Sequence, residues 1–286
     1  MLLVRMRASC AAELPRRRAS GGLSSKVLPS SATAARAEAN VHQGIKLTTE
    51  DRLFVLTGAG ISAESGIATF RDSGGLWGRY RTDDVASPGG WARDPALVWR
   101  FYSERRRVAE AALPNAAHLA LAQLEHELGE RMLICTQNID RLHEAAGTRR
   151  IVHVHGELFR SRCSSAQCAS EPLEDHQRHE DATCLPHCAT CGSLMRPAVV
   201  WFGEEPMLMS DVDDALGSCS VFVAIGTSGV VQPVSGFVKF LCARRPDCRT
   251  VYVGPERPDN AAFFGERRLG CAAAVVPGLF FCANAE

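Results

Sequence analysis

The stretch RLFVLTGAGISAESGIATF, residues 52–70, decides the fold. Its apolar first part predicts a buried β-strand, the glycines at 58 and 60 predict a tight turn, and the part from residue 62 predicts the opening of a helix. Such a turn lets backbone amides approach a phosphate group, and a helix N-terminus adds a favourable dipole. Alanine stands at 63, where the usual dinucleotide fingerprint has its third glycine, and the looser form of the fingerprint allows this. Taken alone, the motif also fits an ordinary turn.

The rest of the chain continues this alternation of strands and helices. Helices are predicted at 93–113, 115–128 and 140–147, and further strands at 131–139, 151–157, 220–228 and 249–255. The first of these helices has Asp94 as its N-cap and Pro95 in its first turn. The alternation predicts an α/β fold, with a Rossmann-like parallel sheet covered by helices on both faces.

Composition limits the number of domains and the kinds of partner that we expect for the protein. The 286 residues are 46% apolar, which suits one large or two small domains with a real core. Basic and acidic residues number 32 each, but residues 1–37 hold seven of the basic residues and only one acid, so the remainder is mildly acidic. We therefore expect no nucleic-acid partner. No run of 18 apolar residues occurs, so we expect no membrane span.

The N-terminal segment, residues 1–44, is rich in Arg, Ala and Ser and poor in acids. This composition is typical of an organellar transit peptide, and a disordered tail has a similar one. No apolar run of the secretory type follows the first charges. We expect mitochondrial import, with another organelle or the cytoplasm as alternatives, and a separate folded domain over residues 45–282.

Five of the twelve cysteines fall within residues 163–191. Cys163 and Cys168, then Cys188 and Cys191, have a spacing similar to that of a four-thiolate zinc ribbon, although the first gap is wide. Four thiolates leave no open position, so we expect one structural Zn²⁺ in a small module at about 159–196. Free cysteines are the alternative, and the ligand set stays open because of four nearby residues: His176, His179, Cys184 and His187.

Polar residues gather where two predicted strands end. TQNIDRLHEAAG (136–147) and HVHGE (153–157) bring amides, a carboxylate and three histidines close to these ends. In open α/β sheets, ligands bind outside the carboxyl ends of the strands, and a histidine there can act as a general base. Spacing alone does not choose between His143, His153 and His155.

Together these motifs resemble the sirtuins, a family of NAD-dependent protein lysine deacylases. The resemblance covers about residues 48–282, in the family's order. It is carried by the cysteine pairs and by GAGISAESGIATFR (58–71), TQNIDRLHEAAG (136–147), HVHGE (153–157), RPAVVWFGE (196–204) and GTSGVVQP (226–233). It implies a sirtuin catalytic domain over 45–282 that uses NAD and one structural Zn²⁺, and that acts on acyl-lysine proteins.

The resemblance also assigns roles by position. His155 matches the catalytic histidine, and the zinc ligands are Cys163, Cys168, Cys188 and Cys191. The implied NAD-binding residues are Gly58, Ala59, Gly60, Ile61, Ser62, Glu64, Phe70, Arg71, Trp77, Gln137, Asn138, Ile139, Asp140, Gly226, Thr227, Ser228, Gly254, Glu256 and Cys271. Gly254 departs from the family, which commonly has asparagine there, and Glu256 is a candidate to replace that contact. Val200, Phe202, Gly203 and Glu204 match the strip that pairs with the substrate backbone.

FYSERRRV (101–108) resembles the branch of the family that removes succinyl, malonyl and glutaryl groups. Tyr102 and Arg105 share a helix face, and a guanidinium group matches a carboxylate with two parallel hydrogen bonds. The resemblance therefore implies that they receive the acidic acyl group, whereas the stretch alone fits a solvated charge run.

The implied reaction gives nicotinamide and O-acyl-ADP-ribose, with His155 as the base that takes a proton from a ribose hydroxyl. Three alternatives are a deacetylase, a mono-ADP-ribosyltransferase on the same fold, and a binding module that uses NAD and zinc without turnover. A binding module needs no base, so the presence of Asn138, Asp140 and His155 together argues against it.

Overall fold

The computed structural model describes residues 44–69 and 79–282. Its centre is a six-stranded sheet whose paired strands all run parallel. The strands are β2 (Leu53–Thr57), β3 (Met132–Thr136), β4 (Ile151–His153), β8 (Val221–Ile225), β9 (Arg249–Gly254) and β10 (Glu266–Leu269). Their order is β10-β9-β8-β2-β3-β4, so the predicted Rossmann-like parallel sheet is confirmed. The chain runs from β2 outward to β4 and then returns to β8 on the other side of β2, which makes the β2–β8 boundary the topological switch point.

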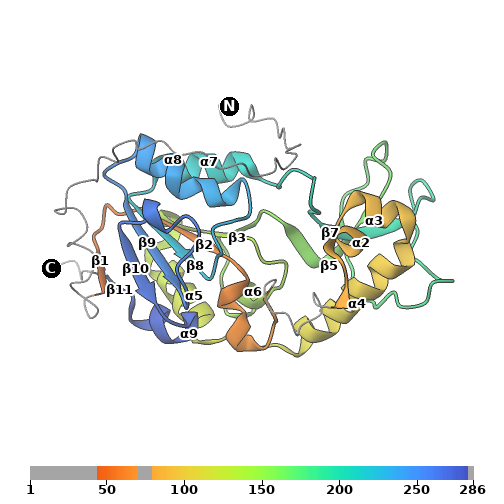
Figure 1. The fold of residues 1–286 in the computed structure, drawn as a ribbon, viewed down its shortest axis with the longest axis horizontal. Helices are drawn as coiled ribbons and strands as arrows, with labels where there is room; N and C mark the ends of the chain where they lie inside the picture. Colours follow the sequence, from red (N-terminus) through yellow and green to blue (C-terminus); the bar gives the residue numbers. More distant parts are fainter. Residues whose placement is uncertain (1–43, 70–78, 283–286) are drawn as a thin grey trace, which may run out of the picture. The chain divides into compact units, whose positions relative to one another are not determined.

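Helices pack on both faces of this sheet, as Figure 1 shows. One apolar cluster joins the sheet to α5 (Ala116–Leu128) and α9 (Ala272–Val275), and the other joins it to α7 (Met209–Ser218) and α8 (Phe237–Arg244). Every residue of β2 and of β8 is buried, which agrees with strands covered on both sides. A short parallel pair, β1 (Ile45–Leu47) with β11 (Phe280–Cys282), lies apart from the main sheet.

The second, smaller part of the fold is an antiparallel sheet with its own helices. Its strands are β5 (Gly156–Cys163), β6 (Leu173–Glu174) and β7 (Met195–Val199), in the order β6-β5-β7. The helices α2 (Thr82–Val85), α3 (Pro88–Arg93) and α4 (Pro95–Ala111) contact one another, and α4 contacts both β5 and β7. The expectation that the cysteine-rich insert stays outside the parallel sheet is therefore confirmed.

The two long predicted helices begin at their caps. The Asp94 carboxylate accepts a hydrogen bond from the amide of Leu97 at 2.8 Å, and α4 then starts at Pro95. Asn115 and His118 form a capping box at the start of α5. The predicted short helix is also present, as α6 (Leu142–Ala145). Among the described residues, no helix has the length and apolar character that crossing a membrane requires.

The prediction of a helix from residue 62 is wrong over the described residues. Two separate 3₁₀ turns, Ala59–Ile61 and Ala63–Ser65, stand there instead, and Gly66 ends the second turn in the left-handed conformation with φ 87°. The side chain of Asn115 donates to the carbonyl of Ile61 at 2.7 Å and to the hydroxyl of Ser65 at 3.0 Å. A partner from α5 thus binds backbone that a continuous helix would use for itself, so a tertiary contact overrides the local pattern.

Candidate active site and metal centre

The predicted cofactor glycines lie at the switch point of the sheet. The amide of Gly60 donates to the carbonyl of Gly226 at 2.9 Å, which joins the turn after β2 to the turn after β8. A Cβ atom at Gly226 would lie 2.4 Å from the amide nitrogen of Ile61, and φ at Gly226 is 63°. Only glycine fits this approach without displacing backbone. The two turns therefore form a compact backbone cradle at the carboxyl ends of β2 and β8, where dinucleotides bind in this class of fold.

A buried polar chain fixes the residues that follow β3. The side-chain amide of Asn138 donates to the hydroxyl of Ser62 at 3.2 Å, and that hydroxyl donates to the carboxylate of Asp140 at 3.0 Å. The amide of Leu142 also donates to Asp140, at 3.1 Å. Burial raises the pKa of Asp140, although these two hydrogen bonds oppose the shift. The structure thus brings together residues that the sequence separates by nearly eighty positions.

Two of the three candidate histidines are engaged in structural contacts. His143 is buried, its Nε2 lies 3.1 Å from the Thr57 hydroxyl, and burial holds its pKa well below the ordinary value. His153 uses both ring nitrogens: Nδ1 lies 3.0 Å from the carbonyl of Asn138, and Nε2 lies 2.7 Å from the Glu144 carboxylate. Burial lowers the pKa of His153, but these bonds outweigh it and raise the pKa overall. Neither ring is arranged to take a proton from a ligand.

His155 is arranged differently. It is half-buried, and its Nδ1 lies 3.1 Å from the carbonyl of Gln137. A carbonyl only accepts, so Nδ1 carries the hydrogen and Nε2 keeps a lone pair, for which no partner is found among the described residues. Burial lowers the pKa of His155, and the Gln137 bond opposes this only in part, so the neutral imidazole is favoured near pH 7. This is the state that a general base requires.

The second predicted cofactor loop, residues 226–228, follows β8 and lies next to β9. The Tyr252 hydroxyl donates to the carbonyl of Thr227 at 3.3 Å, and the carbonyl of Ser228 accepts from the amide of Asp259 at 3.1 Å. A Cβ atom at Gly254 would lie 2.2 Å from the Tyr252 hydroxyl oxygen. The departure from the family's asparagine at Gly254 therefore has a physical reason, because the Tyr252 hydroxyl fills the space that a side chain would need.

The other predicted cofactor residues are spread around this edge. Glu64 accepts a hydrogen bond from the amide of Ala273 at 2.7 Å, next to Cys271, which is the exposed N-cap residue of α9. Glu256 is exposed on the turn after β9. Three predicted residues lie outside the described residues: Phe70, Arg71 and Trp77.

Tyr102 and Arg105 lie together on α4. The Tyr102 side chain is buried, and the Arg105 guanidinium carbon lies 6.0 Å from the centre of its ring. Burial lowers the pKa of the partly buried Arg105, while the charges of Tyr102 and Asp140 raise it. The guanidinium is therefore within electrostatic reach of the residues after β3, so α4 joins the predicted acyl group site to the predicted cofactor site.

The segment after β7 is held by Glu204, which the resemblance singled out, and by Arg196, to which it gave no role. Arg196 donates to both carboxylate oxygens of Glu204, at 2.6 and 2.9 Å, and Glu204 also accepts from the amide of Trp201 at 2.8 Å. The Glu204 carboxylate thus braces its own turn. Phe202 is about half exposed, and its amide donates to the carbonyl of Ala86 at 3.0 Å. No local signal marks Trp201 or Arg196, because their partners are on other elements or across a turn.

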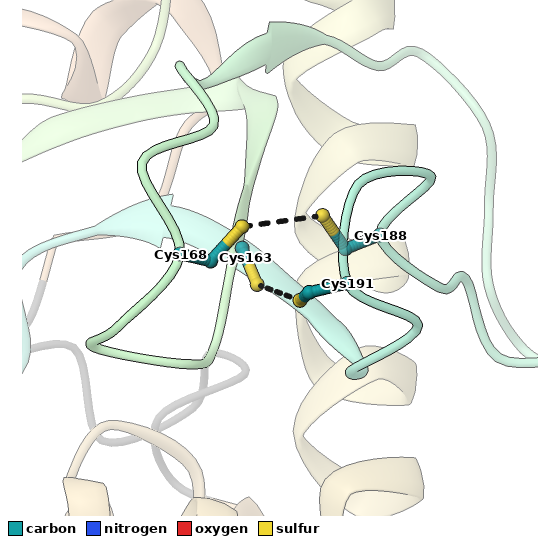
Figure 2. Close-up of side chains that lie close together, drawn as sticks. All are labelled: Cys163, Cys168, Cys188 and Cys191. Atoms are coloured by element: carbon teal, nitrogen blue, oxygen red, sulfur yellow. Dashed lines mark hydrogen bonds between the residues drawn. The ribbon is translucent and has the colours of Figure 1, made fainter.

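The four predicted zinc ligands come together from two loops, as Figure 2 shows. All four sulfur atoms of Cys163, Cys168, Cys188 and Cys191 lie within 4.8 Å of one another, with pairs at 3.5 and 3.7 Å. A tetrahedral zinc ion with Zn–S bonds of about 2.3 Å requires sulfur atoms about 3.8 Å apart. Hydrogen bonds from the Ser170 hydroxyl and from backbone amides lower the pKa of Cys188 to about 5, which favours the thiolate that binds metal. The cluster therefore fits one structural zinc ion.

The residues that left the zinc ligand set open have other places in the structure. Cys184 is exposed and is not a member of the cluster. The Nε2 of His179 lies 2.9 Å from the Asp175 carboxylate, and the His176 ring stacks on Phe159. His187 forms an antiparallel backbone β-bridge with Leu194.

With this geometry established, the comparisons define the family. A family model described as the Sir2 family matches residues 58–233. Proteins named NAD-dependent protein deacylase match with 48% identity: that of Vibrio cholerae over 79% of this chain and 90% of its own length, and that of Caulobacter vibrioides over 79% and 94%. The chain belongs to the Sir2 family, so the resemblance inferred from the sequence motifs is confirmed.

Solved structures agree with this assignment. A Sir2 homologue bound to NAD is 38% identical, with a TM-score of 0.72 over 81% of this chain and 89% of that one. A mutant Sir2 homologue in complex with ADP-ribose is 37% identical, with a TM-score of 0.74 over 81% and 91%. The fold is therefore the sirtuin form of the Rossmann-like α/β fold.

Proposed function

We propose that this protein is an NAD-dependent protein lysine deacylase that prefers acidic acyl groups, namely succinyl, malonyl and glutaryl. The name shared by its bacterial relatives supports the deacylase activity, and the homologue bound to NAD supports the cofactor. The reaction consumes NAD, acyl-lysine and one water molecule, and it releases nicotinamide, free lysine and O-acyl-ADP-ribose. Its partners are acylated proteins, and the zinc ion braces the small module without taking part in the chemistry.

The observation that carries this proposal is that His155 is held, through Gln137, at the same carboxyl edge of the sheet as the backbone cradle. When bound, NAD supplies the ribose carbon that accepts the acyl oxygen and the hydroxyl that receives the acyl group. Residues 58–60 and Gly226 would hold its phosphates, and the neutral His155 Nε2 would accept the proton of the ribose hydroxyl. Because two weak reactants must be held in line, most of the acceleration comes from positioning.

The acidic acyl preference depends on Tyr102 and Arg105. The guanidinium group is always charged and binds a carboxylate in a bidentate manner, and the tyrosine hydroxyl adds a donor. Acetyl-lysine has no carboxylate, so it gains nothing from Arg105. We expect weak deacetylation for this reason.

The test is nicotinamide release from NAD with acetyl-, malonyl-, succinyl- and glutaryl-lysine peptides compared side by side. Arg105→Met should lose desuccinylation and keep or raise deacetylation, whereas the exposed Arg107, changed to Met, should alter neither. An equal loss on both peptides in Arg105→Met, or no loss on either, would contradict the acidic preference.

A mono-ADP-ribosyltransferase would use the same cofactor edge, and the products separate the two. Mass spectrometry of the reaction should find O-acyl-ADP-ribose and unmodified lysine. Protein that carries ADP-ribose instead would favour the transferase.

We also propose mitochondrial import, based on the basic, acid-poor segment before residue 45. A fluorescent reporter fused to residues 1–45 should enter mitochondria. A reporter that stays in the cytosol would contradict this localisation.

A further inference from the structure

Trp201 is clamped from two sides immediately after β7. The Arg196 guanidinium carbon lies 3.3 Å from the centre of the indole ring, and the same guanidinium donates to the Val199 carbonyl at 2.9 Å. The Glu204 carboxylate accepts from both Arg196 and the Trp201 amide. Burial by itself would raise the pKa of Glu204, but these bonds outweigh it and lower the pKa, so the carboxylate stays charged. The position and tilt of the indole are thereby fixed.

The clamped indole reaches across to α4. Its Nε1–H donates to the Tyr102 hydroxyl oxygen at 3.1 Å, and both side chains are 2% exposed. An indole N–H can only donate, so the Tyr102 oxygen accepts, and the hydroxyl hydrogen must turn to another direction. Burial raises the pKa of Tyr102 above its ordinary value, so the phenol keeps this hydrogen at neutral pH. The hydrogen bond from Trp201 thus makes Tyr102 a directed donor.

Arg105 lies close to Tyr102 on the same helix. The guanidinium of Arg105 lies over the rings of both Phe101 and Tyr102, at 5.8 and 6.0 Å from their centres. The two residues project from neighbouring turns of one face of α4. A carboxylate bound to this guanidinium can use the tyrosine hydroxyl as a further donor, because the Trp201 indole donates to the hydroxyl oxygen and takes none of its hydrogen.

We infer that Trp201 is a positioning residue for acyl selectivity: its indole N–H occupies the Tyr102 oxygen and leaves the hydroxyl hydrogen for the distal carboxylate of the acyl group. Arg196 and Glu204 act one step further away, by holding Trp201 in place. This inference rests on the proposed preference for acidic acyl groups.

Trp201→Phe tests the inference, because it removes the donor and keeps an aromatic ring. We expect the KM for a succinyl-lysine peptide to rise about fivefold, the factor that corresponds to one ordinary hydrogen bond. Turnover at saturation should be kept, since the carboxylate contact is the same in the ground state and in the transition state. The acetyl-lysine KM should not change. An equal rise for both peptides, or no rise for either, would overturn the inference.

Trp99→Phe is the matched control. Trp99 is also buried, lies on α4, and donates its indole N–H to the carbonyl of Met195 at 3.0 Å, but it makes no contact with the Tyr102 hydroxyl. Its replacement should affect the two peptides alike. Zinc content and thermal unfolding of both variants show whether the fold is kept. If Trp201→Phe does not fold, Arg196→Lys provides the second variant, and it should raise the succinyl KM by a smaller factor at unchanged acetyl KM; equal effects on both peptides would count against the inference.

A double-mutant cycle with Tyr102→Phe separates positioning from packing. Trp201→Phe should have no further effect on the succinyl KM once the Tyr102 hydroxyl is gone, and additive effects would overturn the inference. A wild-type enzyme that removes acetyl as readily as succinyl contradicts the proposed preference. In that case the cycle is measured on the peptide with the fastest turnover, and the coupling between positions 102 and 201 still decides whether Trp201 positions Tyr102.

Discussion

At the carboxyl edge of the parallel sheet, the predicted cofactor residues are held mainly by backbone contacts and by short side chains. In contrast, large buried side chains hold α4 to the small module. Gly60 contacts Gly226 directly through the main chain. Arg106, by contrast, is fully buried, donates to the Leu158 carbonyl at 2.9 Å and pairs with Asp175 at 3.2 Å. A backbone cradle fits a cofactor that every member of a family shares. Because α4 is held by side chains, substitutions in α4 can change the substrate contacts without altering the backbone cradle.

The same comparison explains the neighbouring arginines of α4. Arg106 is the residue that anchors the helix, and the guanidinium of Arg105, one position earlier, lies over the Tyr102 ring. Asp175, the partner of Arg106, also lies 2.9 Å from the His179 Nε2 within the cysteine-rich insert. The insert therefore sets the position of the helix that carries Tyr102 and Arg105, in addition to holding the zinc ligands.

The largest expected effect comes from the cofactor edge. His155→Ala should lower acyl-lysine turnover by about 10²–10⁴-fold, the usual contribution of a general base, while calorimetry still detects NAD binding. His153→Ala is the comparison, because His153 is tied to Glu144 and Asn138 and should act on stability instead. If His153→Ala is inactive and His155→Ala keeps nearly normal turnover, the assignment of His155 as the base is wrong.

The next effect tests the small module. Cys188→Ser should lose most of the bound zinc and destabilise residues 163–191, because structural zinc binding of about 10–16 kcal/mol is part of the folding free energy. Cys184→Ser should keep about one zinc ion per chain, since four thiolates complete the site. Metal analysis of the purified proteins checks both. If Cys188→Ser keeps its full zinc content and Cys184→Ser loses zinc, the fourth ligand is Cys184 instead of Cys188.

A smaller effect is expected from one methyl group in the cradle. Gly226→Ala should lower the free energy of unfolding by about 1–3 kcal/mol through the clash with Ile61, and should weaken NAD binding. Gly129→Ala is matched in φ, at 57° against 63°, but a Cβ there meets no atom within 4 Å. It should cost only about 1 kcal/mol and leave NAD binding unchanged. Equal losses in the two variants, measured by denaturant unfolding, would show that the close approach is unimportant.

The smallest effect concerns pH. Catalysis needs neutral His155, and burial lowers its pKa below the ordinary 6.5. The value of kcat/KM should therefore stay level as pH falls from about 8 to 6.5, and should decrease only at lower pH, where the imidazole becomes protonated. A pH profile measured on one acyl-lysine peptide checks this. A decrease in kcat/KM with a midpoint above pH 6.5 would contradict the predicted protonation state of His155.

The parts of the fold that sequence predicts well are those with local signals. The strands at 53–57 and 221–225 are apolar runs apart from Thr57, and α4 begins at its predicted cap, Asp94. The paired spacing of the cysteines predicts the cluster that the structure forms. The helix predicted from residue 62 failed because its signal is local too, and Asn115, which binds the turn there, is about fifty positions away in the chain.

By itself, the sequence determined an α/β fold with a glycine cradle, a four-cysteine cluster and a set of three candidate histidines, because each of these depends on short-range patterns of apolarity, glycine and spacing. The family resemblance then selected His155. Only the tertiary structure showed how His155 is held by the Gln137 carbonyl, why glycine stands at 254, and how Trp201 meets Tyr102. The last two residues are 99 positions apart in the chain and share one hydrogen bond. Contacts of that kind depend on how separate elements pack, and no local pattern of residues encodes them.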